Sequence, residues 1–186
     1  MYSGNLGLYY DLENMLKVIE KIPEKKSADG REVAYVFIGN GTLKSKLEEY
    51  VKSHNMDNVI FLPYQDKEKL VYSLNAADVH ICVNAKGIKG VSCPSKYYGI
   101  AAVGKPVLAS LEEGTEIRCL IEETESGLIS EPEDYASFEK NTRAFIALDH
   151  DALRVMGQRG HDKLITELKK DISIQKYTEA ILGIED

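Results

Sequence analysis

The sequence predicts an α/β protein whose sheet is doubly wound and mainly parallel, with about six strands. Three observations support this fold class. Short apolar runs rich in β-branched residues recur along the chain, amphipathic stretches separate them, and glycines follow most of the runs. Strands that alternate with helices of this length form right-handed βαβ units, in which helices cover both faces of the sheet.

Each predicted strand is a continuous apolar run, which is typical of strands that are buried on both faces. A first strand is expected over residues 2–6 and a short sixth strand over residues 127–129. The four strands between them are residues 34–38 (AYVFI), 59–62 (VIFL), 79–83 (VHICV) and 106–109 (PVLA).

The segments between the strands place their apolar residues on one face of a helix. Three such faces are formed by Leu12, Met15, Leu16, Ile19 and Ile22, by Leu43, Leu47, Tyr50 and Val51, and by Leu70, Leu74 and Ala77. A fourth helix is expected to end at residues 101–103. From about residue 134 the chain is predicted to be helical, and residues 1–186 are expected to form a single domain.

Composition and charge argue against two classes of partner. The chain has a net charge of −7 and no basic tract, which disfavours nucleic acid and direct binding to an anionic membrane. Cys82, Cys93 and Cys119 form no C-x-x-C pair, which favours a reduced, cytoplasmic chain. No apolar run approaches the roughly 20 residues of a membrane span. Because strand-like sequence follows Met1 directly, we expect a piece of a longer protein.

Ligands of open α/β sheets bind beyond the carboxyl ends of the strands, and the sequence places its glycines there. The loops after the first three strands contain Gly4, Asn5 and Gly7, then Gly39, Asn40 and Gly41, then Pro63 and Tyr64. Tight turns need glycine whatever they bind, so these loops alone leave a purely structural interpretation open.

The loop after the fourth strand (NAKGIKGVSCPSK) carries a more specific signal. Proline is favoured at the first position of a helix, so Pro94 predicts a helix start, with Cys93 near the cap. Free amides in the first turn, including those of Ser95 and Lys96, favour an anion such as a diphosphate. The hydroxyls of Ser92 and Ser95 and the Lys96 ammonium would add to this site. In the alternative interpretation, Lys96 is solvated and the serines only cap the helix.

Other phosphate-binding and metal-binding patterns are missing from the sequence. The glycines around Gly4 and Gly39 do not complete a dinucleotide-binding G-x-G-x-x-G, and there is no G-x-x-x-x-G-K-[S/T] segment. The four histidines have no metal-ligand spacing. The acidic pairs at residues 112–113 and 122–123 fall in a stretch predicted to be helical, where they indicate a solvated face.

In order and content, these segments resemble the C-terminal, donor-binding domain of the family 4, or group 1, glycosyltransferases, which are retaining enzymes of GT-B fold. The matching segments are residues 2–7 (YSGNLG), 37–41 (FIGNG), 58–64 (NVIFLPY) and 70–78 (LVYSLNAAD). The most specific match is residues 94–109 (PSKYYGIAAVGKPVLA), which is similar to the donor-site helix of a subgroup with a P-S-K signature. The resemblance implies a Rossmann-like, three-layer α/β/α fold that forms one half of a GT-B enzyme.

The resemblance also implies a site for a nucleoside-diphosphate sugar, with a UDP-sugar as the first expectation. The residues expected at the diphosphate are Ser92, Cys93, Ser95, Lys96, Gly4, Asn5 and Gly7. Those expected at the base and ribose are Gly39, Asn40, Gly41, Pro63, Tyr64 and Gly99. No catalytic residue is expected in this chain, because the acceptor site and catalytic histidine of the family belong to an N-terminal domain. No cofactor or metal is expected either, because helix amides and a lysine would take the place of a metal. The fragment alone would transfer nothing.

The implied activity is transfer of a hexosyl or N-acetylhexosaminyl group to a glycan or a lipid-linked acceptor, in cell-surface polysaccharide biosynthesis. The enzyme would be cytoplasmic and would reach the inner face of the membrane only through the full-length protein or its acceptor. In relatives the last helix crosses back to the first domain. Partial exposure is therefore expected for Ile172, Tyr177, Ile181 and Leu182.

The sequence departs from the family pattern at several positions. The E-x7-E motif would place glutamates at Val91 and Gly99, and the basic residues of the first loop are absent at Leu8 and Tyr9. The positive charge of those basic residues would then come from a lysine of the fourth loop, namely Lys96, Lys86 or Lys89. Two alternatives stay open: a degenerate, non-catalytic GT-B partner domain, and a domain similar to the sugar-nucleotide epimerases of GT-B fold.

Overall fold

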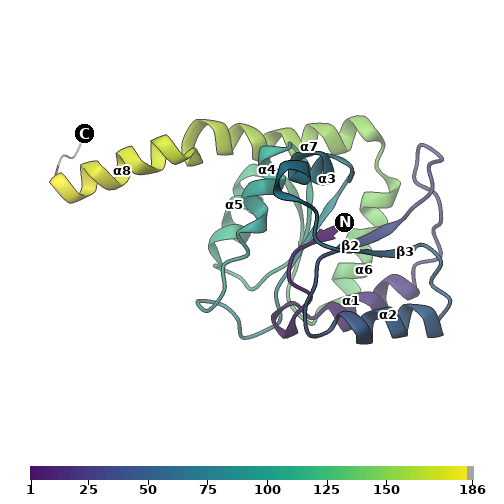
Figure 1. The fold of residues 1–186 in the computed structure, drawn as a ribbon. Coiled ribbons are helices and arrows are strands. Elements are labelled where there is room, and N and C mark those ends of the chain that lie inside the picture. Colours follow the sequence, from purple (N-terminus) through teal and green to yellow (C-terminus); the bar gives the residue numbers. More distant parts are fainter. Residues whose placement is uncertain (184–186) are drawn as a thin grey trace.

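Short parallel strands form the centre of the fold in the computed structural model, which describes residues 1–183 (Figure 1). The strands are β1 (Tyr2–Ser3), β2 (Tyr35–Ile38), β3 (Val59–Leu62), β4 (His80–Val83), β5 (Val107–Ser110) and β6 (Gly127–Ser130). They form two three-stranded sheets, ordered β1-β2-β3 and β4-β5-β6. The sheets meet where the Ile81 amide donates to the Met1 carbonyl and the Met1 ammonium donates to the Val79 carbonyl, both at 2.7 Å. The spatial order is therefore β3-β2-β1-β4-β5-β6, as expected for a doubly wound fold.

Helices cover both faces of these strands (Figure 1). One face carries α1 (Leu12–Glu20), α2 (Lys44–Ser53) and α6 (Tyr135–Ala147). The other carries α3 (Leu70–Asn75), α4 (Lys96–Ala102), α5 (Glu116–Thr124) and α7 (His150–Lys163). Two one-turn 3-10 helices, η1 (Leu8–Tyr10) and η2 (Lys67–Lys69), lie in loops. A π-helical turn, η3 (Leu164–Leu168), joins α7 to α8 (Lys170–Leu182).

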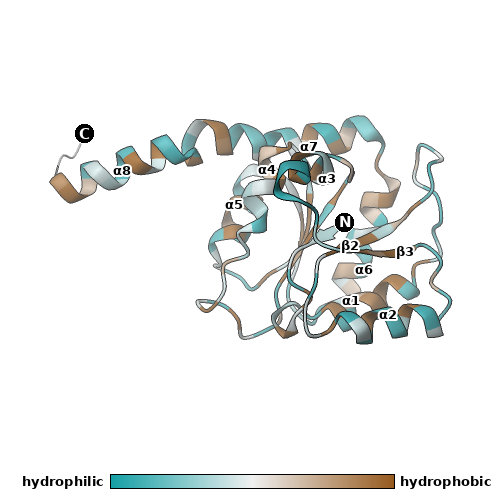
Figure 2. Cartoon of the chain, in the orientation of Figure 1, coloured by the Kyte–Doolittle hydropathy of each residue, from teal (hydrophilic) through white to brown (hydrophobic). Residues whose placement is uncertain are grey.

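The strands have two cores because successive side chains point to opposite faces. In β4, Ile81 and Val83 belong to the core on the α1 side, whereas Cys82 belongs to the core under α4 and α5. Figure 2 shows hydrophobic residues along the strands and more hydrophilic residues on the outer sides of the helices. This double burial explains why the strands are continuous apolar runs, and it confirms the predicted α/β/α layers.

The boundaries of five strands agree with the sequence-based expectations to within one residue. The first strand is the exception, since residues 4–6 of the predicted strand are not in it. Gly4 adopts a positive φ of +150° and ends the strand, although its amide still donates to Ile38 at 2.9 Å. Residues 4–6 therefore form a loop that stays hydrogen-bonded to the carboxyl end of β2 and to the loop after it.

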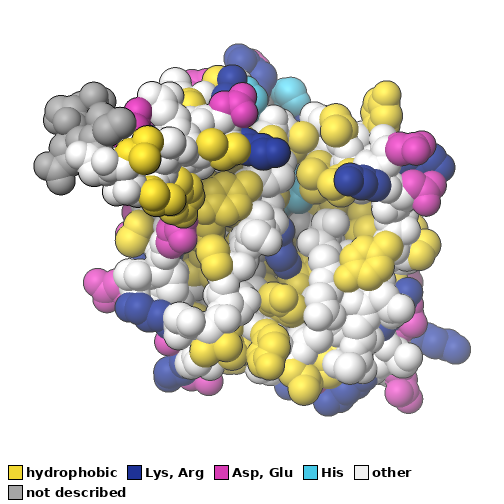
Figure 3. All heavy atoms as spheres, turned by 60° about the vertical axis from the view of Figure 1, so that its left-hand side comes forward, with side chains coloured by type: hydrophobic (Ala, Val, Ile, Leu, Met, Phe, Trp, Pro, Cys, Tyr) yellow, Lys and Arg dark blue, Asp and Glu magenta, His cyan; other side chains and the backbone are white. Residues whose placement is uncertain are grey.

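The helix α8 extends away from the body of the domain (Figure 1), and none of residues 170–182 is buried. Tyr177 and Ile181 are 72% and 82% exposed, Leu182 is exposed, and Ile172 is half-buried. Hydrophobic side chains gather along this helix at the upper left of Figure 3. The expected exposure is confirmed, and the alternative that α8 simply packs on this domain is wrong.

His80 makes the stability of the fold dependent on pH. Its side chain is buried in β4, and Nε2 lies 2.9 Å from the Leu74 carbonyl oxygen. Burial, with a smaller effect of the Met1 ammonium, lowers the pKa of His80 from 6.5 to about 3. Between these values the unfolded chain binds a proton that the folded chain excludes. The free energy of unfolding therefore falls as the pH drops below 6.5.

We expect the variant His80→Gln to lose this part of the pH dependence, which amounts to at most about 1.4 kcal/mol per pH unit for one proton. Urea denaturation between about pH 7.5 and about pH 4.5 measures the two slopes. The exposed His150 supplies the matched control, His150→Gln. Equal slopes for His80→Gln and the unaltered chain would contradict a neutral, buried His80.

Candidate functional site

The carboxyl ends of β1, β2 and β3 bring together the loops that the sequence predicts as a ligand site. The Leu6 amide donates to the Asn40 carbonyl at 2.8 Å, and the Gly39 amide donates to the Leu62 carbonyl at 3.0 Å. The ring of Tyr64 lies 3.5 Å from the position that a Cβ atom on Gly39 would take. The three loops therefore lie in contact with one another at the carboxyl ends of β1, β2 and β3.

Gly39 and Gly41 are required by the packing of this edge. A Cβ atom on Gly39 (φ +148°) would lie 1.8 Å from the Gly4 carbonyl oxygen, and one on Gly41 would lie 2.4 Å from the Leu6 carbonyl oxygen. The structural interpretation of these two glycines is therefore confirmed. Contact of Gly39, Asn40 and Gly41 with a base stays a prediction. Asn5, whose side chain lies beside Gly7 and Gly41, is exposed at the same edge.

The helix α4 begins at Lys96, so the prediction that it begins at Pro94 is wrong by two residues. The Ser95 amide donates to the Cys93 carbonyl at 2.8 Å, and the Tyr97 amide to the Pro94 carbonyl at 3.1 Å. The expected free amide at Ser95 is therefore not found, because a turn already satisfies it. The Lys96 amide has no acceptor among residues 1–183. Ser95 makes no side-chain capping bond, so the prediction that it caps the helix is wrong.

The Lys96 side chain turns back from the start of α4 toward the loop after β1. Its Nζ lies 3.6 Å from the centre of the Tyr2 ring and 4.8 Å from that of the Tyr10 ring. A Cβ atom on Gly4 would lie 3.3 Å from this Nζ. The Nζ atom is buried and has no hydrogen-bond partner among the residues described. The alternative interpretation of Lys96 as a solvated lysine is therefore wrong.

Burial lowers the pKa of Lys96 from 10.5 to about 8, because a buried ammonium loses its hydration. At neutral pH the side chain is therefore still mainly charged. The faces of the Tyr2 and Tyr10 rings stabilise this charge by cation–π contacts. An aromatic face provides no acceptor for the three ammonium protons, so their hydrogen-bonding capacity stays unused.

The other two lysines of the loop after β4 are bound to neighbouring loops. Lys86 Nζ lies 2.9 Å from Glu133 Oε2, and Lys89 Nζ donates to the Glu113 carbonyl at 2.6 Å. These contacts hold both side chains away from the buried position of Lys96. Of the three lysines proposed from the sequence, Lys96 is the one that lacks a polar partner within residues 1–183.

Glu112 contacts the loop after β4, which the sequence does not indicate. The pair at residues 112–113 was predicted to be helical and solvated, but it lies in the loop between β5 and α5. Glu112 Oε2 accepts hydrogen bonds from the amides of Gly87 at 3.1 Å and Lys89 at 2.9 Å. These partners are 25 and 23 residues away in the sequence, so no local pattern could indicate them.

Gly99 lies on α4 and faces α3. A Cβ atom on Gly99 would make an ordinary contact of 3.5 Å with Leu74 Cδ1. The packing therefore leaves room for the first atom of a side chain at this position. The departure from the family pattern at Gly99 is not explained by a steric need for glycine.

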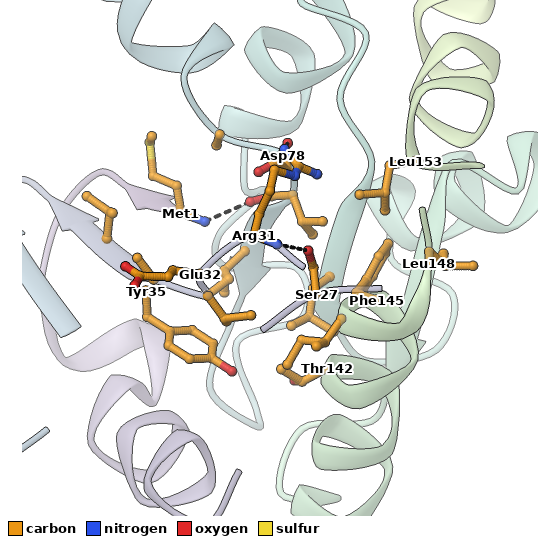
Figure 4. Close-up of a pocket in the computed structure, with 18 of the residues that line it drawn as sticks. Met1, Ser27, Arg31, Glu32, Tyr35, Asp78, Thr142, Phe145, Leu148 and Leu153 are labelled. Atoms are coloured by element: carbon orange, nitrogen blue, oxygen red, sulfur yellow. Dashed lines mark hydrogen bonds and ion pairs between the residues drawn. The ribbon is translucent and has the colours of Figure 1, made fainter. Parts of the chain in front are cut away.

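A cavity of about 250 Å³ lies at the opposite edge of the sheet (Figure 4). Tyr35, Phe145 and Leu153 contribute to its lining, together with the ion pair between Arg31 and Asp78 at 3.0 Å. Because its residues surround the amino ends of the strands, the cavity is not where ligands of α/β sheets bind. We therefore place the candidate site at the carboxyl ends of the strands.

Within residues 1–183, no three His, Cys, Asp or Glu side chains are grouped as metal ligands would be. In the same residues, every helix is too short or too polar to cross a bilayer. The expected absence of a metal stays a prediction.

Comparison with known proteins identifies the family. The profile of the family described as "Glycosyl transferases group 1" matches residues 1–163. The chain therefore belongs to the group 1 glycosyltransferases, as its resemblance to them implied.

Curated relatives carry names of the same kind. The chain is 27% identical over 183 residues to the probable glycosyltransferase WbjE of Pseudomonas aeruginosa, covering 97% of this chain and 43% of WbjE. It is 29% identical over 122 residues to the putative colanic acid biosynthesis glycosyl transferase WcaI of Escherichia coli, covering 66% of this chain and 28% of WcaI. The chain thus spans less than half the length of either relative.

Solved structures confirm the fold class. Sucrose-phosphate synthase from Thermosynechococcus elongatus superposes with a TM-score of 0.76 at 18% identity, covering 99% of this chain and 45% of the synthase. HepE from Anabaena, solved in complex with UDP, superposes with a TM-score of 0.71 at 13% identity, covering 98% and 48%. The chain has the Rossmann-like fold of one half of these GT-B glycosyltransferases.

We expect the variant Gly99→Ala to stabilise the domain by about 0.5–1 kcal/mol, because glycine in a helix interior is unfavourable relative to alanine. Thermal denaturation should show a rise in Tm of about 1–4 °C. The matched control is Gly157→Ala in α7, where the new Cβ would lie 2.1 Å from the Gly104 carbonyl oxygen and should destabilise. A loss of stability in Gly99→Ala would contradict the room seen beside Leu74.

Proposed function

We propose that this domain binds the nucleoside-diphosphate sugar of a retaining glycosyltransferase, with Lys96 as the group that receives the diphosphate. The observation that carries this proposal is the buried Lys96 ammonium, which lacks a hydrogen-bond partner at the edge formed by the first three loops. Membership of the group 1 glycosyltransferases supports the same function.

The chemistry of a buried ammonium favours an anionic ligand. A buried charge without a hydrogen-bonding partner costs free energy, and a diphosphate oxygen would recover part of it through a charge-assisted hydrogen bond. Binding would place an acceptor oxygen beside Nζ, which already lies next to Gly4. Because α4 is only seven residues long, the ammonium supplies more of the positive charge than the helix end does.

The other residues that we propose at the diphosphate are Ser92, Cys93 and Ser95, which precede Lys96 in the sequence, and Gly4, Asn5 and Gly7 of the loop after β1. Of these, Gly4 adjoins the Lys96 Nζ. For the base, Tyr64 offers a ring that is 56% exposed and adjoins Gly39. Aromatic rings of this kind stack on nucleobases. The UDP complex of HepE supports UDP as the first nucleotide to test.

In the proposed reaction the bond between the sugar and the diphosphate breaks at the surface of this domain, and the sugar passes to an acceptor held by another part of a longer enzyme. Lys96 would stabilise the negative charge that develops on the departing diphosphate. The name of WcaI, a putative colanic acid biosynthesis glycosyl transferase, supports a role in polysaccharide biosynthesis. The transferred group that we propose is hexosyl or N-acetylhexosaminyl. We propose that it works in the cytoplasm, without a metal, on a glycan or lipid-linked acceptor.

One observation favours a second candidate function. Gly99 has no carboxylate that could bind the ribose hydroxyls. The loss of such a group is what a degenerate partner domain would show. If neither the unaltered chain nor Gly99→Glu binds a UDP-sugar, the degenerate function is supported.

We expect the variant Lys96→Met to weaken UDP binding at least about tenfold, because it removes a charge-assisted hydrogen bond while keeping a long apolar side chain. Calorimetric titration with UDP measures the affinity. NMR titrations with UDP-, GDP- and ADP-sugars show which resonances shift. The control is Lys69→Met, on an exposed lysine of η2. Equal affinities of Lys96→Met and the unaltered chain would count against the proposed role of Lys96.

A further inference from the structure

We infer that Glu112 is a positioning residue for donor binding, because its carboxylate fixes the loop of residues 84–93 that leads into α4. The inference rests on the proposed function for the place of the donor. Its structural basis is the pair of hydrogen bonds that one carboxylate oxygen accepts, from the amides of Gly87 at 3.1 Å and Lys89 at 2.9 Å.

At the tip of this loop Ile88 is half-buried, and the other residues from 86 to 91 are exposed. Gly87 and Gly90 have open space where a side chain would be, and Val91 is 73% exposed. Both glycines have positive φ angles, +81° and +76°, which few other residues would adopt. The conformation of the tip therefore depends on polar contacts.

Those contacts come from opposite sides of the loop. At its base, the Ala85 amide donates to the Tyr9 carbonyl at 2.7 Å, and Asn84 Nδ2 donates to the Ser92 carbonyl at 3.2 Å. At its tip, the hydrogen bonds to Glu112 involve a charged acceptor, which makes them stronger than bonds between neutral groups. The base sets where the loop starts and ends, and Glu112 sets where its tip lies.

The β5–α5 loop is itself built to hold Glu112 in place. The Thr115 hydroxyl donates to the Glu112 carbonyl at 2.8 Å. The Lys89 ammonium donates to the Glu113 carbonyl at 2.6 Å. A Cβ atom on Gly114 would lie 3.0 Å from the same Lys89 Nζ. The loop of residues 84–93 thus donates three hydrogen bonds to the β5–α5 loop, two from backbone amides to Glu112 and one from the Lys89 ammonium to the Glu113 carbonyl.

The consequence for binding follows from the end of the loop. Ser92 and Cys93, proposed at the diphosphate, directly follow the segment that Glu112 holds. If the tip were free, the donor would have to order the loop on binding, and this cost would lower the apparent affinity. Glu112 therefore preorganises the site without touching the donor.

The test compares Glu112→Ala and Glu112→Gln with the matched control Glu113→Ala. Glutamine keeps a carbonyl oxygen that can accept from both amides, and the exposed side chain of Glu113 lies outside the contacts described above. We expect Glu112→Ala to speed hydrogen exchange at Gly87 and Lys89 in the absence of nucleotide and to weaken UDP binding about fivefold or more. Glu112→Gln should recover most of both, and Glu113→Ala should match the unaltered chain.

The outcomes separate this inference from the proposed function. If the unaltered chain does not bind UDP, the proposed function fails and the positioning role fails with it. If the unaltered chain binds UDP and Glu112→Ala binds it equally well, the positioning role alone is overturned, even where exchange is faster. Unchanged exchange in Glu112→Ala would overturn it as well, because the loop would then be held by other contacts.

Discussion

The close approach of the loops after β1 and β2 is the constraint on which the candidate site depends. The backbone at Gly39 touches the Gly4 carbonyl so closely that even a methyl group would not fit between them. Gly4, which this close approach holds in place, lies beside the Lys96 Nζ that is buried against the Tyr2 ring. A steric requirement in the backbone thus helps to define the surroundings of a buried charge.

The buried ammonium also shows why contacts across the β1–β4 junction matter. Lys96 comes from the helix after β4, while Tyr2, Tyr10 and Gly4 come from β1 and its loop. Two hydrogen bonds of Met1 place these strands side by side. This is the point of a doubly wound sheet where the strand order reverses, and helices on either side diverge there to leave a crevice. The topology therefore determines where a charged side chain can be enclosed.

Much of the fold could be predicted from the sequence, because strands buried on both faces are continuous apolar runs, as in residues 79–83. The place of the candidate site, at the carboxyl ends of the strands, could be predicted from the topology alone. The direction of the Lys96 side chain could not be predicted, since it depends on two tyrosines that lie 94 and 86 positions earlier in the sequence. The contacts of Glu112 could not be predicted for the same reason, since its partners lie 25 and 23 residues away in the sequence. The predicted start of α4 is two residues too early, because Pro94 lies in a turn before the helix and not at its first position.

The helices α7 and α8, joined by η3, run in sequence from the body of the domain to its extremity (Figure 1). Gly157 and Gly160 let α7 lie against Gly104 and Ser126 with no intervening side chain, which fixes the near end of this arm. The thirteen residues of α8 add a reach of about 20 Å. The apolar side chains of Tyr177, Ile181 and Leu182 are therefore carried clear of both cores of the domain.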